Sequence, residues 1–120
     1  MNLDKIQTIF PNFQMESFHK FDTVTALRWE TVIDNIFFEA HKNLTLEMTC
    51  PDNYKIIIEF IDVYSFQFQG NGQISGFYIE DMSANGYENN VKYKIGDFEQ
   101  NEAIEFYCAD IIVKGIEKIA

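Results

Sequence analysis

Positively charged residues are scarce in this sequence. Its 120 residues include 9 Lys and Arg against 19 Asp and Glu, so the formal net charge is −10. Proteins that bind DNA or RNA neutralise phosphates with clustered Lys and Arg, whereas Arg28 stands alone here among dispersed lysines. Because Lys and Arg are few and dispersed, we do not expect the protein to bind nucleic acid, and binding to an anionic membrane surface is disfavoured for the same reason. An acidic balance keeps many proteins soluble, and its functional interpretation is attraction of a basic partner.

Cysteine and histidine are also scarce, which excludes several kinds of site. Cys50, Cys108, His19 and His41 are too dispersed to predict the four converging ligands of a zinc site. The sequence has no calcium-loop motif, no Gly-x-Ser-x-Gly turn and no glycine-rich turn that opens a helix. We therefore expect no metal, no cofactor and no catalytic residue. Cys108 falls in the apolar phase of an expected strand, which predicts a buried, inert thiol.

Long apolar runs are missing as well. No stretch approaches the roughly 20 residues that span a bilayer as a helix, so we expect no membrane role. The first ten residues carry Asp4 and lack the apolar segment of an export signal. We expect a cytoplasmic protein whose two thiols stay reduced and unpaired, folded as a single domain over residues 1–120.

Aromatic residues, by contrast, are abundant, and the twelve Phe and six Tyr favour β-structure. The clearest pattern lies in residues 54–68, where alternate residues are apolar and only Asp62 breaks the alternation. A straight strand of this length would measure roughly 50 Å, whereas a domain of this size has a radius of gyration of about 14 Å. We therefore expect a long strand that bends at Asp62 through a bulge or a corner.

Alternation and turn residues predict the strands that precede this one. We expect a first strand at residues 25–29, a tight turn at residues 34–35 between short apolar strands, and a polar break at residues 41–43. Residues 44–50 form the cleanest half-buried strand, and Pro51 begins the turn into the long strand.

The strands that follow are predicted in the same way. The glycine-rich turn at residues 69–73 should join two antiparallel neighbours, the second at residues 74–82. Residues 83–90 form the longest polar interval and favour a loop. A further hairpin is expected within residues 91–108, with its turn at residues 99–102.

The two ends of the chain are expected to differ from this core. Asn2 can cap a short helix within residues 1–12, which would cover an edge of the fold. A phase slip at residues 109–110 predicts a bulge that mirrors the first, and the tail from Lys114 favours a helical turn. The fold class is therefore all-β: one antiparallel β sandwich or partly open barrel of about seven or eight strands over residues 22–114, with a short N-terminal helix.

Carboxylates concentrate in the second half of the chain, where we place the candidate partner-binding site. Two neighbouring hairpins would present them as one acidic patch, and no Lys or Arg lies between residues 97 and 110. Such a patch is either a solvated face or a surface that docks a cationic protein with salt-sensitive steering. Its predicted members are Glu80, Asp81, Glu88, Asp97, Glu99, Glu102, Glu105 and Asp110.

Paired carboxylates also occur in glycosidases and related enzymes. Glu80 and Asp81 are adjacent in an expected strand and point to opposite faces, so they do not share a cleft unless a bulge intervenes. Asp97 and Glu99 share a face, but a solvated pair beside a polar turn is the simpler interpretation. We therefore expect no enzyme.

Five short motifs lie within residues 55–113. They are Phe60-x-x-Val63, Phe66-x-Phe68, Ile79-Glu80-Asp81, Tyr93-x-Ile95-x-Asp97-x-Glu99 and Phe106-Tyr107-Cys108-x-Asp110-Ile111-x-Val113. Together they resemble small uncharacterised bacterial β-rich families, some of which are found among the immunity proteins of polymorphic toxin systems. The resemblance implies a cytoplasmic protein that binds and blocks a toxin domain, and it carries over no catalytic residue.

Two functions are compatible with these features. The first is non-enzymatic binding of a basic protein, most concretely as an immunity-like inhibitor that occludes a basic toxin. The alternative is a β barrel whose Phe and Tyr rings enclose a small apolar ligand, although rings that only fill the core give the same composition. An exposed edge strand would also permit a homodimer.

Overall fold

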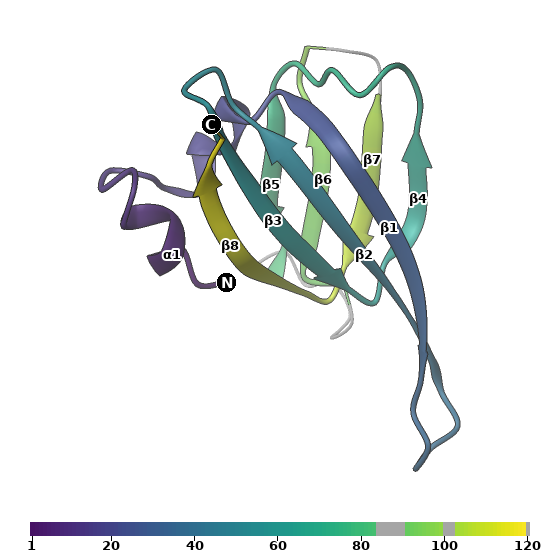
Figure 1. Ribbon diagram of the computed structural model, residues 1–120. Helices are drawn as coiled ribbons and strands as arrows, with labels where there is room; N and C mark the ends of the chain where they lie inside the picture. The colour runs from purple at the N-terminus through teal and green to yellow at the C-terminus, as the bar shows by residue number, and fades with distance from the viewer. Residues whose placement is uncertain (84–90, 100–102, 120) are drawn as a thin grey trace.

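The computed structural model describes residues 1–83, 91–99 and 103–119, and in these residues eight strands form two antiparallel sheets that face each other (Figure 1). One sheet has the strand order β1-β2-β3-β8 and the other β4-β7-β6-β5. The predicted all-β fold is confirmed. The strands are β1 (Thr23–Ile33), β2 (Ala40–Thr49), β3 (Tyr54–Ile61), β4 (Tyr64–Phe68), β5 (Phe77–Asp81), β6 (Tyr93–Asp97), β7 (Ile104–Cys108) and β8 (Asp110–Lys118).

The core fills the space between the two sheets. Inward positions are the apolar half of each alternating pattern, as the sequence predicts for Leu44, Leu46 and Met48 of β2. Phe60 of β3 meets Phe106 of β7 edge-on, with ring centroids 4.9 Å apart, and this contact joins the sheets. Because no polar or charged residue of the described chain is buried, hydrophobic burial dominates the stability of this interior.

Residues 54–68 form two strands rather than one. β3 ends at Ile61 in the first sheet, Asp62 adopts a left-handed backbone with φ of 55°, and β4 begins at Tyr64 in the second sheet. The predicted bend at Asp62 is confirmed as a corner between the sheets. The prediction of one continuous strand is wrong, because the chain changes sheets at this corner.

A second corner lies directly opposite the first. β7 gives way to β8 at Ala109, where the sequence predicts a bulge, and the chain returns to the first sheet. The Ala109 amide donates a hydrogen bond to the Ile61 carbonyl at 2.9 Å. Pairing of β3 with β8 thus continues as pairing of β4 with β7, and the four strands form one antiparallel ribbon that bends once and belongs to both sheets.

Residues of β2 hold the first corner. His41 Nδ1 lies 2.6 Å from a carboxylate oxygen of Asp62, whose amide donates to Asn43 Oδ1 at 3.3 Å. The Val63 amide donates to the Lys42 carbonyl at 2.8 Å. The predicted polar break at residues 41–43 is wrong, because these polar residues continue β2 and bond to the backbone and side chain of the corner.

The β1–β2 pair continues as a hairpin beyond the rest of the sandwich (Figure 1). The chain reverses direction where predicted, but the prediction of a tight turn at residues 34–35 is wrong, because residues 34–39 form the loop and residues 36–38 do not lie in a strand. The Asp34 amide donates to the Glu39 carbonyl at 2.8 Å, which closes a longer loop than the sequence predicts.

The glycine-rich segment at residues 69–73 connects two strands that do not pair. β4 and β5 are the outer strands of the second sheet, so the prediction of antiparallel neighbours is wrong. The segment bonds instead to the start of β1: the Val24 amide donates to the Gly72 carbonyl, and the Ile74 amide to the Asp22 carbonyl, both at 2.7 Å. Gly72 has φ of 93°, and a Cβ there would lie 2.8 Å from the Val24 carbonyl oxygen, so this crossing requires glycine.

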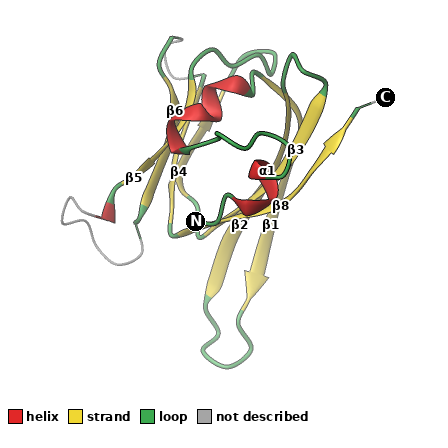
Figure 2. Ribbon diagram, turned by 90° about the vertical axis from the view of Figure 1, so that its left-hand side faces the viewer, coloured by secondary structure: helices red, strands yellow, loops and turns green. Residues whose placement is uncertain are grey.

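The N-terminal residues cover the side of the sandwich between the edge strands β8 and β5 (Figure 2). The predicted short helix is present as α1 (Asp4–Gln7), which packs against β8. The prediction that Asn2 caps it is wrong, because Leu3 occupies the N-cap position; the Asn2 side chain instead accepts a hydrogen bond from the Asp4 amide at 2.7 Å. A 3₁₀ helix, η1 (Met15–Lys20), packs against β5, although the sequence pattern does not predict it.

The remaining predictions concern the C-terminal half. The hairpin within residues 91–108 is confirmed by the pairing of β6 with β7. Most of its predicted turn at residues 99–102, and most of the predicted loop at residues 83–90, lie outside the described residues. β8 extends to Lys118, so the predicted helical turn from Lys114 is wrong, and the sheet region ends later than predicted because β8 keeps pairing with β3.

The corner pair should make the stability of the fold depend on pH. Asp62 raises the pKa of His41 above its ordinary value of 6.5, through their hydrogen bond and through charge attraction. A raised folded-state pKa stabilises the fold fully below the unfolded-state pKa, and this contribution is lost as pH rises through the folded-state pKa. We expect the free energy of unfolding, measured in urea, to be larger at about pH 6 than at about pH 8, and we expect Asp62→Asn to remove this excess.

Asn is a matched replacement at this position because it tolerates the left-handed backbone of the corner. Asp62→Asn therefore removes the charge without straining the chain. Equal pH dependence of unfolding in the two proteins would contradict the prediction.

Candidate functional site

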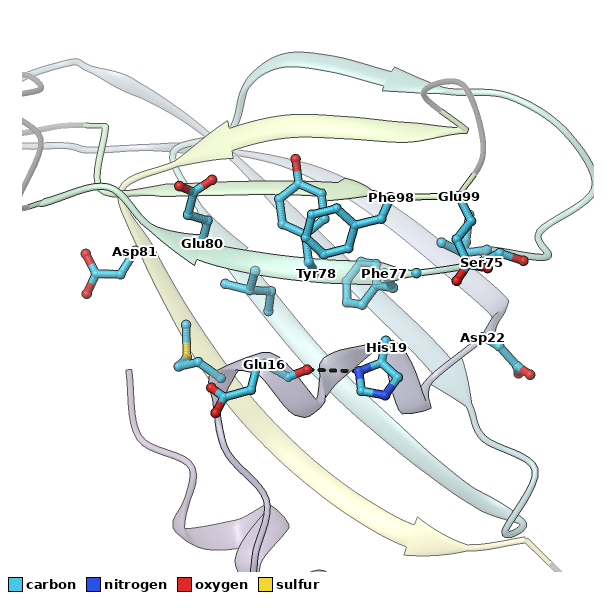
Figure 3. Close-up of a pocket in the computed structure, with 14 residues that line it drawn as sticks. Glu16, His19, Asp22, Ser75, Phe77, Tyr78, Glu80, Asp81, Phe98 and Glu99 are labelled. Carbon is cyan, nitrogen blue, oxygen red and sulfur yellow. Dashed lines mark hydrogen bonds between the residues drawn. The ribbon is translucent and has the colours of Figure 1, made fainter.

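A groove of about 750 Å³ runs between η1 and the edge strand β5 (Figure 3). The helix forms one side and β5 the other, and two residues that follow β6, Phe98 and Glu99, stand beyond β5. Apolar side chains from η1, from β5 and from the segment before β5 lie among the lining, including Met15, Ile74 and Ile79. The groove therefore combines an apolar surface with charged margins.

One buried ring fixes η1 beside β5. Phe18 is fully buried, and its ring meets the ring of Phe77 edge-on with centroids 6.4 Å apart. A capping box closes the first turn of η1. With Phe18 turned to the core, Glu16 and His19 are exposed beside the groove, where His19 Nδ1 lies 2.9 Å from the Glu16 carbonyl oxygen.

Two aromatic rings form the margin opposite η1. Tyr78 and Phe98 stack with centroids 4.3 Å apart and an angle of 22° between their planes. Two glycines make room for them. A Cβ on Gly96 would lie 2.7 Å from the Tyr78 hydroxyl, and one on Gly76 would lie 3.1 Å from Phe98 Cβ. The outer face of Phe98 remains open, since 76% of the residue is exposed.

Five carboxylates surround the groove, and its described lining residues include no Lys or Arg. In the part of the chain that the structure describes, none of the five forms an ion pair. Lys94 lies opposite Glu80 in the β5–β6 ladder, and the charge of the Met1 ammonium helps to lower the pKa of Asp81. Five carboxylates and these two ammonium groups leave a local charge of −3 (−5 + 2). The carboxylates are Glu16, Glu80 and Asp81 toward one end of the groove and Asp22 and Glu99 toward the other (Figure 3).

Several cations of the chain are paired on other surfaces. On the outer face of the first sheet, Lys55 and Arg28 contact Glu47 at 3.1 and 2.8 Å, and their hydrogen bonds lower the pKa of this carboxyl. Lys20 contacts Asp52 at 2.8 Å. The acidic surplus of the sequence is therefore uneven in space, and part of it collects along the groove.

Asp81 is held in its charged form. The Ser83 hydroxyl and the Ser83 amide donate to Asp81 Oδ1 at 2.5 and 2.9 Å, which lowers the pKa of the carboxyl. Burial raises the pKa of the nearby Tyr93 hydroxyl, and the negative charges of Asp81 and Asp110 add to this effect. The groove thus keeps a permanent negative charge at this end.

Of the eight predicted partner-binding residues, the structure describes six, and three of these lie at the groove. Glu80, Asp81 and Glu99 line the groove. The expectation that Glu80 and Asp81 do not share a cleft without a bulge is wrong: β5 pairs with β6 without a register shift, and Asp81 is the exposed last residue of β5. Glu88 and Glu102 lie outside the described residues. The groove therefore unites three members of the predicted set.

The other three predicted residues lie elsewhere. Asp97 Oδ2 accepts a hydrogen bond from the Ile104 amide at 3.1 Å, so its carboxylate joins the end of β6 to the start of β7. Glu105 sits on β7 opposite Gln67 of β4, two strands away from β5. Asp110 begins β8 at the second corner, where its Oδ1 accepts from the amide of Ile111 at 2.8 Å.

Sequence reasoning missed two groove residues, Glu16 and Asp22. Both belong to the N-terminal segment, and the packing of Phe18 on Phe77 brings this segment to β5 from about sixty positions away in the sequence. The local sequence feature that could have indicated η1 is the spacing of Gln14 and Ser17, which form a capping box at the start of this helix.

Cys50 and Cys108 are unpaired, as predicted, and Cys108 is buried, as predicted; Cys50 is buried as well. Burial raises the pKa of Cys108 to about 12, which keeps this thiol protonated at neutral pH. No three His, Cys, Asp or Glu side chains in the described part of the chain gather as a metal site. Across the same residues, no helix has the length and apolar character needed to cross a membrane.

The tip of the β1–β2 hairpin is a second exposed feature. Ile36, Phe37 and Phe38 are 78%, 70% and 83% exposed. The Asp34 carboxylate accepts from the amides of Ile36 and Phe37 at 2.8 and 3.3 Å, so the loop is ordered by its own hydrogen bonds. Phe38 has φ of 56°, a backbone region that is costly for a bulky side chain. The loop thus displays apolar rings at an energetic cost to the chain itself.

Comparisons with protein-family models, with curated proteins and with solved structures found no match. The resemblance of residues 55–113 to immunity-protein families therefore stays a prediction.

Two glycine variants can test whether the left-handed backbone of Phe38 destabilises the hairpin tip. Phe38→Gly relieves the left-handed strain, whereas Phe37→Gly removes a similarly exposed ring without that relief and adds freedom to the unfolded chain. We expect Phe38→Gly to be about 1 kcal/mol more stable than Phe37→Gly in urea denaturation. If Phe38→Gly is the less stable variant, the Phe38 ring packs against the chain and the strain argument is wrong.

Proposed function

We propose that this protein is a non-enzymatic protein-binding module that holds a basic partner in the groove between η1 and β5. The observation that supports this proposal is the unpaired negative charge of the groove. Outside the groove four carboxylates contact Lys or Arg, whereas none of the five groove carboxylates does so in the described residues. With Lys94 and the Met1 ammonium included, the groove has a local charge of −3 (−5 + 2). A cationic surface would restore local neutrality, and long-range attraction would speed its approach.

The shape of the groove also favours a macromolecular ligand. The carboxylates lie at both ends, Phe77 lies between them, and the lining also includes the apolar residues Met15 and Ile79. Protein interfaces commonly combine an apolar centre with a polar margin, and the exposed ring of Phe98 adds an aromatic contact of the kind that is enriched there. A segment with basic residues spaced around an apolar one would match both features.

The most concrete form of this function is an immunity-like inhibitor in the cytoplasm. The strand motifs of residues 55–113 imply it, and a toxin domain that acts on nucleic acid would present the required basic surface. In this form the groove would occupy the toxin surface that the toxin's own anionic ligand uses. The acidic charge of the groove is consistent with such mimicry.

The alternative of an enclosed apolar ligand draws no specific support from the described interior. The ring of Phe106 contacts both Phe60 and Phe66, with centroids 4.9 and 5.6 Å apart. These inward-facing rings fill space between the sheets by packing on one another. A ligand of this class would have to displace such contacts.

Affinity capture from native cells tests the proposed function. We expect the tagged protein to retain a basic partner at low salt and to release it at moderate salt, because salt screens exposed charges. A groove variant with Glu16→Gln, Glu80→Gln and Glu99→Gln should lose this partner while keeping its thermal stability, since all three side chains are exposed.

A matched control separates the groove from net charge. Asp4→Asn, Glu30→Gln and Glu117→Gln remove the same number of charges from exposed positions outside the groove, and this variant should retain the partner. Equal loss in both variants would assign binding to net charge alone. Full retention by the groove variant would remove the groove from the proposal.

A further inference from the structure

We propose that the groove is an arginine-recognition site, in which an arginine side chain of the basic partner stacks on Phe98 between carboxylates. This inference rests on the proposed function and adds the chemical identity of the residue that the partner must supply. It distinguishes arginine from lysine, which net charge alone does not.

The platform for the guanidinium is the open face of Phe98. One face of this ring is covered by Tyr78 at a centroid distance of 4.3 Å, and the residue is 76% exposed on its remaining surface. A stacked pair backed by a strand holds its ring plane better than a lone surface Phe does. A planar cation over an aromatic face gains cation–π attraction and stacking, and arginine makes such contacts more often than lysine.

The position of the platform depends on Gly76. The Phe98 amide donates to the Gly76 carbonyl at 3.0 Å, and Gly76 has φ of 78°. A Cβ at this glycine would lie 3.1 Å from Phe98 Cβ and 3.3 Å from Glu99 Cγ. The glycine therefore lets the aromatic ring and the adjacent carboxylate approach the groove together.

The carboxylates beside the platform match the other property of arginine. Glu99 follows Phe98 directly, and Asp22 lies near the same end of the groove (Figure 3). In the described chain neither carboxylate has a Lys or Arg partner. A guanidinium stacked on Phe98 presents its N–H groups around the edge of its plane, where carboxylates can accept from them, whereas an ammonium has no plane to stack.

The size of the groove permits more than one such side chain. At about 750 Å³ it exceeds what a single arginine fills, and the second group of carboxylates, with Glu16 and Glu80, lies toward the other end. The ligand class is therefore an extended segment with spaced basic residues. The arginine on Phe98 is the residue that sets specificity.

Two synthetic peptides test the inference on the intact protein. Both are nonapeptides, acetylated and amidated, in which four arginines or four lysines alternate with glycine. Dissociation constants are measured by NMR titration at low ionic strength, following amide signals of β5. We expect the arginine peptide to bind about two- to fivefold more tightly than the lysine peptide.

Variants then locate the preference. Phe98→Ala should reduce the ratio of the two dissociation constants to about one, whereas Phe37→Ala, which removes an exposed ring of the hairpin tip, should leave the ratio unchanged. Equal binding of the two peptides by the native protein, or an arginine preference that survives Phe98→Ala, would overturn the arginine inference while leaving an acidic groove that binds basic segments. Absence of β5 shifts with either peptide, or undiminished binding by the groove variant, would overturn the proposed function together with the inference.

Discussion

The fold depends on one antiparallel ribbon that bends between two sheets. β3 pairs with β8 and β4 with β7, and both strands turn at the same level, where the Ala109 amide meets the Ile61 carbonyl. A hydrogen-bonded ladder constrains its two strands to bend together, because a bend in one strand alone would break the bonds on one side. The left-handed Asp62 and the residues of β2 around it define where the ribbon bends, and this fixes how the two inner faces oppose each other.

The candidate site follows from the way the other strands add to this ribbon. β2 and then β1 attach to β3, while β6 and then β5 attach to β7, so among the described strands β5 ends the second sheet. The N-terminal segment occupies that side of the sandwich, with Phe18 buried against β5. An edge strand beside a helix leaves a groove rather than a closed surface, and the polar positions of both elements line it.

Much of this fold could be predicted from local pattern. Most of the wrong predictions concern contacts between residues that lie far apart in the sequence, which a local pattern does not encode. Alternation identified the buried faces of β2 and β3, and Asp62 was recognised as a bend because it breaks a run of apolar positions. Which strands pair was not predictable at residues 69–73, because a glycine-rich turn looks the same whether it joins neighbours or crosses a sandwich. Polar residues 41–43 looked like a break because the corner that they bond to lies twenty positions away.

Contacts between distant residues also limit how much of the candidate site can be predicted from the sequence. Glu80, Asp81 and Glu99 could be proposed because they lie on neighbouring elements of the second sheet, but Asp97 belongs to a backbone contact within the sheet. Glu16 and Asp22 come from the other end of the chain, and only the packing of a buried Phe places them beside β5. The charge pattern along the sequence therefore indicates an acidic surface, but it does not identify all of the residues that form it.

The long-range pairing within the ribbon has a consequence for the order in which the chain folds. β1, β2 and β3 form a meander of sequence neighbours, but β3 pairs on its other side with a strand that is far along the chain, for example Ile58 with Val113. High contact order of this kind slows folding to about the millisecond-to-second range. Until the chain has formed the second sheet and reached β8, one edge of β3 has unpaired backbone groups that can pair with strands of other molecules. The repulsion between copies with a net charge of −10 opposes intermolecular pairing during that interval.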